Sequence, residues 1–191
     1  MKMIEIQVLN KKTKEYNEWK YDKYSVALPT EIIEFGRYVG IDPGTTHLGL
    51  AELYSVDNKD KVTLWQITIS RQEDAIKRMR LHHFIMGKCL YIPSHMIGNA
   101  SDTNCVVEGA SFGNTFRQVE LAEQRIILAW WMFDSSPTHI VPPTTIRKAV
   151  FGSGKIKAHE AWQLAGIPKN KQPNDALAAL SCAYYGMMKG E

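Results

Sequence analysis

The chain has 191 residues, of which 45% are hydrophobic and 23% are charged, and its formal net charge is +3. This composition is typical of a globular domain with a full core, and it excludes disordered, collagen-like and coiled-coil proteins. No apolar run approaches the roughly 20 residues that span a bilayer, so we expect a soluble, cytoplasmic protein without a membrane partner. Three cysteines without a CxxC pair are expected to be reduced packing residues.

The first 35 residues differ from the remainder of the chain. Ile4, Ile6 and Val8 alternate with polar residues, and aromatic side chains return among charges after a turn. We therefore predict a hairpin-like extension over residues 1–35 and a main domain over residues 36–191.

Hydrophobic periodicity predicts five strands in the main domain, interleaved with helices. The first three strands have short links, which favour antiparallel pairing. A meander followed by alternating helices and strands predicts an α/β domain with one mixed five-stranded sheet flanked by helices. The predicted strands cover residues 37–42, 48–56, 62–69, 104–108 and 138–141. The predicted helices cover residues 73–90, 115–133, 144–150, 158–165 and 173–188.

Three acidic residues stand at the ends of apolar elements. Asp42 ends a strand, Glu108 ends another, and Asp175 opens an alanine-rich helix. An unpaired carboxylate there costs several kcal/mol of desolvation, so three of them suggest convergence on hard divalent cations. Each also has a plainer interpretation: Asp42 suits a turn, Asp175 suits a helix N-terminus, and Glu108 can simply mark a strand end.

The segments YVGIDPGTTHLGLA, CVVEGASF and NDALAALSCAYY together resemble the RuvC family of Holliday junction resolvases. The segment HIVPPTTIRKAVFGSGKIKAHEAWQLAG is similar to that family's proline, basic helix and lysine-bearing loop. The resemblance covers about residues 37–188. It implies a ribonuclease H-like fold and a homodimer that cuts four-way junctions and other branched DNA with Mg²⁺.

The resemblance also implies roles for individual residues. Asp42, Glu108 and Asp175 match the family's metal-binding carboxylates, which would hold two Mg²⁺ ions, with Mn²⁺ as a substitute. Lys157, on a glycine-hinged loop, would neutralise charge in the transition state, although a solvated surface lysine is the plainer interpretation. Arg147 and Lys157 match basic positions that contact DNA.

Further DNA contacts are expected from Lys148 and Lys155, which crowd the same basic segment. Phe112 lies near the position of the family's aromatic wedge. The family's fourth metal ligand corresponds to Gln172, which carries no charge. We leave that ligand open between Asn174, Glu160 and water.

Two further features have open interpretations. The helix predicted at 115–133 has a wide apolar surface that suits either a dimer contact or a buried core helix. His82 and His83 are either DNA-facing or a solvated pair.

Two other functions stay open at this point. Asp42-Pro43-Gly44-Thr45-Thr46 is similar to the first phosphate loop of the actin and Hsp70 ATPases, but no second such loop is present. A junction-binding protein that does not cleave DNA is the non-enzymatic alternative.

Overall fold

The computed structural model describes residues 3–7, 19–26, 36–56, 59–69, 75–90, 103–109, 122, 138–167 and 174–189. Its strands are β1 (Met3–Gln7), β2 (Trp19–Val26), β3 (Arg37–Pro43), β4 (His47–Val56), β5 (Lys59–Ile69), β6 (Thr103–Glu108) and β7 (Thr138–Val141). Its helices are α1 (Ala75–Leu90), α3 (Pro143–Phe151), α4 (Ala158–Leu164) and α5 (Asn174–Lys189).

The described strands form one sheet in the order β1-β2-β5-β4-β3-β6-β7. Pairing is antiparallel from β1 through β3, whereas β3–β6 and β6–β7 are parallel. The predicted mixed sheet of five strands, β5-β4-β3-β6-β7, is confirmed. The hairpin-like extension supplies β1 and β2, and β2 pairs with β5, so that seven strands share one sheet.

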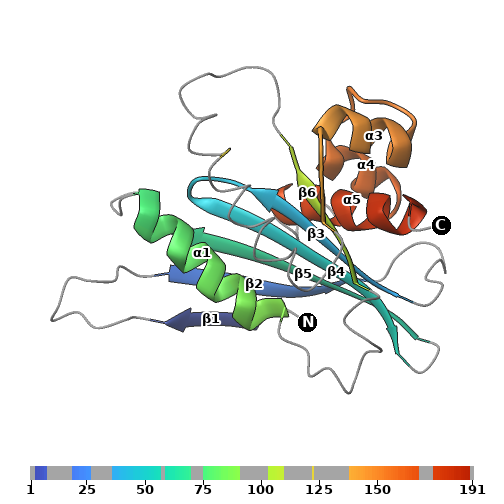
Figure 1. Ribbon diagram of the computed structural model, residues 1–191. Helices are drawn as coiled ribbons and strands as arrows, with labels where there is room; N and C mark the ends of the chain where they lie inside the picture. Colours follow the sequence, from blue (N-terminus) through green and yellow to red (C-terminus); the bar gives the residue numbers. More distant parts are fainter. Residues whose placement is uncertain are drawn as a thin grey trace, which may run out of the picture.

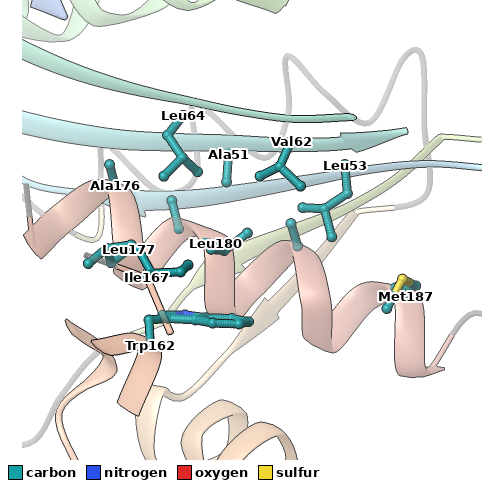
Figure 2. Close-up of a cluster of buried hydrophobic side chains, with 12 residues drawn as sticks. Ala51, Leu53, Val62, Leu64, Trp162, Ile167, Ala176, Leu177, Leu180 and Met187 are labelled. Atoms are coloured by element: carbon teal, nitrogen blue, oxygen red, sulfur yellow. The ribbon is translucent and has the colours of Figure 1, made fainter. Parts of the chain in front are cut away.

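Helices cover both faces of this sheet, with α1 on one side and α3, α4 and α5 on the other (Figure 1). Side chains alternate across a strand, so the central strands bury apolar residues in both directions. The α1-side cluster contains Val39, Ile41, Leu48, Leu50, Trp65, Ile67, Leu81, Met86, Leu90, Cys105 and Val107. The α5-side cluster contains Ala51, Leu53, Val62, Leu64, Trp162, Ile167, Ala176, Leu177, Ala179, Leu180, Ala183 and Met187 (Figure 2).

The alanine-rich α5 approaches the sheet to backbone contact. A Cβ atom added to Gly40 of β3 would lie 1.9 Å from the Ala179 carbonyl oxygen, and one added to Gly49 of β4 would lie 2.0 Å from that of Asp175. No side chain fits at either distance, so both glycines are required by the helix above them. Small residues on the strands and on the helix thus bring the first turn of α5 directly onto the sheet.

Several boundaries match the sequence prediction closely, and β7 matches it fully. β4 ends at Val56 as predicted, whereas β5 begins at Lys59, three residues closer to the turn than the predicted start at residue 62. The helix predicted at 115–133 lies outside the described residues, apart from the single residue 122. Among the described helices, none is long and apolar enough to cross a membrane.

The interpretation of His82 as DNA-facing or solvated is wrong. Its side chain in α1 is fully buried. Burial lowers the pKa of His82 to about 3, with smaller contributions from Arg78 and His47. The ring is therefore neutral at physiological pH and belongs to the packing of α1, while His83 has no described side chain.

Candidate metal and DNA site

Asp42 and Glu108 lie side by side at one end of the sheet. Ile41 of β3 pairs in parallel with Val107 of β6, and each acidic residue follows its paired residue directly. Neighbouring strands are roughly 4.8 Å apart. Because Ile41 and Val107 belong to the α1-side cluster, the two acidic residues point to the α5 side.

Asp175 reaches the same end of the sheet from α5. It stands in the first turn of that helix, and its carbonyl group lies against Gly49. Gly49 is the β4 partner of Asp42. Three elements that are distant in the sequence, β3, β6 and α5, thus meet at what we call the acidic corner: Asp42, Glu108 and Asp175.

Gln66 of β5 belongs to this corner but was not singled out in the sequence. It pairs across the sheet with Gly49, and its Nε2 donates a hydrogen bond of 2.9 Å to Oδ2 of Asp175. The residue is only 7% exposed. A polar residue two positions after the apolar Leu64, on the same face of the strand, was the available signal.

Arg147 of α3 lies against the acidic corner. Its Nη2 is 3.6 Å from Oε1 of Glu108, and 28% of the Arg147 side chain and 14% of the Glu108 side chain are exposed. The residue predicted to contact DNA is thus placed beside one of the predicted metal ligands.

The negative charge of the acidic corner affects the pKa of the Cys182 thiol. This α5 residue is fully buried. Its pKa is raised well above its usual value, first by burial and then by the negative charges of Glu108 and Asp42, while Arg147 acts in the opposite direction. Both carboxylates therefore act electrostatically on the sheet-facing side of α5.

The other predicted basic residues lie on the surface of the α3–α4 region. Lys148, Lys155 and Lys157 are exposed, and Nζ of Lys157 is 3.6 Å from Oε1 of Glu160. Glu160, one of the alternatives for the fourth metal ligand, therefore pairs with Lys157 on the exposed face of α4. Phe112 and Gln172 lie outside the described residues.

The donor set of the corner suits a hard cation, although its side chains are not gathered around one point. Within the described part of the chain, no three His, Cys, Asp or Glu side chains are grouped as ligands for one ion. Glu108 is turned to Arg147 and Asp175 to Gln66. The donors are all oxygens, as Mg²⁺ requires, and Oε1 of Gln66 is buried without a hydrogen-bond partner among the described residues.

No protein-family model matches the chain. The crossover junction endodeoxyribonuclease RuvC of Christiangramia forsetii is 26% identical over 165 residues, and the match covers 80% of this chain and 81% of that protein. A Thermus thermophilus RuvC structure aligns with a TM-score of 0.56 and 22% identity over 78% of this chain and 92% of that one. The resemblance to the RuvC family is confirmed.

A second RuvC structure, that of T. thermophilus RuvC in complex with a Holliday junction substrate, aligns with a TM-score of 0.54. It is 19% identical over 78% of this chain and 91% of that one. The predicted ribonuclease H-like fold is confirmed by these RuvC structures. In this RuvC-like chain the acidic corner lies where antiparallel β3–β4 meets parallel β3–β6.

Proposed function

We propose that the protein is a structure-selective endonuclease that resolves four-way DNA junctions by Mg²⁺-dependent phosphodiester hydrolysis. The observation that carries the proposal is the acidic corner, where register-matched Asp42 and Glu108 meet the first turn of α5 that bears Asp175. Similarity to RuvC proteins supports the choice of substrate, because one related structure holds a Holliday junction. In this proposal residues 36–191 are the nuclease domain and residues 1–35 its extension.

In the proposed hydrolysis, the residues of the acidic corner hold the metal ions. Asp42, Glu108 and Asp175 would hold two Mg²⁺ ions. Bound Mg²⁺ supplies an activated water near neutral pH and stabilises the leaving oxygen. The backbone of the three carboxylates is held by β3, β6 and α5, so their oxygens would be offered to the cations, and the cations to a phosphate, without reorganising the backbone.

Basic residues of the α3–α4 region would hold the DNA backbone. Arg147, beside Glu108, suits a phosphate that is brought to the carboxylates, and Lys157 suits the charge that develops on that phosphate. Lys148 and Lys155 would bind phosphates further out, and Phe112 is proposed to contact the junction.

The active form is proposed to be a homodimer. A four-way junction is resolved by two nicks in two strands, and one acidic corner acts on one strand at a time. Two copies related by a two-fold axis supply one site for each nick. Analytical ultracentrifugation with and without a junction measures the number of copies bound.

The direct test is cleavage of a mobile four-way junction by wild-type and Asp42→Asn protein in Mg²⁺. We expect paired nicks from the wild type, and retained junction binding without cleavage from the variant. Binding without cleavage by the wild type, in Mg²⁺ or Mn²⁺, would instead support a junction-binding protein. ATP hydrolysis without junction cleavage would support the actin-like alternative.

A further inference from the structure

Gln66 occupies an unusual place for an amide side chain. It lies in the α5-facing row of β5, in register with Gly49, which in turn is in register with Asp42. Because Gly49 has no side chain and carries the backbone of Asp175 above it, Asp175 is seated between Gln66 on one side and Asp42 on the other. Gln66 thus lies at the edge of the acidic corner, next to Asp175.

Of the two polar atoms of the Gln66 amide, one has a hydrogen-bond partner among the described residues and the other does not. Its Nε2 is committed to Oδ2 of Asp175 at 2.9 Å, and a carboxylate can only accept, so the orientation of the amide is fixed. The other end, Oε1, is buried and has no hydrogen-bond partner within the described residues. Buried carbonyl oxygens normally have one, so this oxygen requires an explanation.

We propose that Oε1 of Gln66 is a neutral oxygen ligand of the divalent cation held at the acidic corner. The inference rests on the proposed function and assigns a ligand that the sequence left open at Gln172. Amide carbonyl oxygens are ordinary ligands of hard cations. The hydrogen bond to Asp175 holds the amide so that its free oxygen lies beside that carboxylate, and each residue orients the other.

Two substitutions at position 66 distinguish a role of Gln66 as a metal ligand through Oε1 from a role only as a hydrogen-bond donor through Nε2. Gln66→Met keeps the length and removes both polar ends. Gln66→Glu keeps an oxygen at the end of the side chain and removes the donor. Thr63→Val is the matched control, because Thr63 is a buried polar residue of the same strand on the opposite, α1-side face.

The measurement is Mn²⁺ affinity by isothermal titration calorimetry, together with the Mn²⁺-induced rise in melting temperature, which follows affinity by mass action. We expect Gln66→Met to weaken Mn²⁺ binding by about 10-fold, as loss of a supporting group at a metal site does. Gln66→Glu should bind Mn²⁺ at least as tightly as the wild type, and Thr63→Val should match the wild type.

Two results would overturn the inference. Unchanged Mn²⁺ affinity in Gln66→Met means that Oε1 is not a ligand of the cation. Equal weakening in Gln66→Met and Gln66→Glu means that only the donor to Asp175 matters. Asp42→Asn separates these failures from a failure of the proposed function: if that variant binds Mn²⁺ like the wild type, the acidic corner is not the metal site.

Discussion

Strand β3 carries a charged residue at each of its ends, and the two ends use charge differently. At its start, Arg37 donates through Nε to Glu52 of β4 and through Nη2 to the carbonyl oxygen of Leu90, which closes the end of α1. Only 3% of the Glu52 side chain is exposed. We call this set of three residues the Arg37 lock.

At the other end of β3 lies the acidic corner, where the elements that carry Asp42, Glu108 and Asp175 meet on the α5 side. The Arg147–Glu108 contact there spans 3.6 Å and is partly exposed, whereas Arg37 and Glu52 are 2.5 Å apart and more deeply buried. A tight buried pair serves the fold, because removing either partner leaves a buried charge without its counter-charge. The looser, partly exposed pair leaves the Glu108 carboxylate more accessible to solvent, as the proposed metal-binding role requires.

The largest expected effect is on the Arg37 lock. Arg37→Met leaves the Glu52 carboxylate buried without its guanidinium, which should lower the free energy of unfolding by about 3–5 kcal/mol. Urea denaturation measures this loss. The double variant Arg37→Met, Glu52→Leu should recover most of it, and a single variant within 1 kcal/mol of wild type (about the spread of exposed ion pairs) would contradict the assignment of the lock as structural.

The next effect concerns His82, on the same side of the sheet as the Arg37 lock. Its folded pKa of about 3 lies below the ordinary 6.5, so the unfolded chain takes up the proton first and stability falls as the pH drops below 6.5. The expected loss is roughly 1.5 kcal/mol between pH 6.5 and pH 5. Urea denaturation of wild type and His82→Leu at both pH values isolates the contribution of His82. An equal fall in the free energy of unfolding in both proteins would show that His82 does not titrate in this way.

A smaller effect on stability, with a large one on activity, is expected at the acidic corner. Glu108→Gln loosens a partly exposed ion pair, so the free energy of unfolding should change by less than about 1 kcal/mol. Junction cleavage should fall by more than the roughly 100-fold that loss of an indirect metal contact costs. Lys189→Ala, at the exposed last residue of α5, is the control and should cleave normally.

The smallest effect on stability is expected at Lys157. Its exposed contact with Glu160 contributes little, so Lys157→Ala should alter the free energy of unfolding by less than about 0.5 kcal/mol. If Lys157 contacts a phosphate, the slope of log affinity against log salt for a junction should decrease by about 1. Fluorescence anisotropy of a labelled junction at several salt concentrations measures this slope. Lys189→Ala, an equal charge change at the last residue of α5, should leave the slope unchanged.

Local pattern explains what could be predicted from the sequence. The runs that became β3, β6 and β7 combine apolar residues with clear ends, and the positions of Asp42 and Glu108 at strand ends followed from them. Contacts between distant residues could not be predicted. Gln66 contacts Asp175 across 109 positions, and the alternation around Gln66 indicates its face of the strand but not its partner. His82 was misplaced because its burial depends on the sheet beneath α1 rather than on its polar neighbours.

The pairing of β2 with β5 has a consequence for behaviour in concentrated solution. In the RuvC-like sheet taken alone, β5 would be an outer strand with a long row of unpaired peptide groups. Here Trp19–Val26 pairs with Val62–Ile69 and covers that row. Removing residues 1–35 should therefore expose β5 as an edge strand whose unpaired backbone groups can pair with other chains. Aggregation, rather than loss of catalysis, should be the first effect of this truncation.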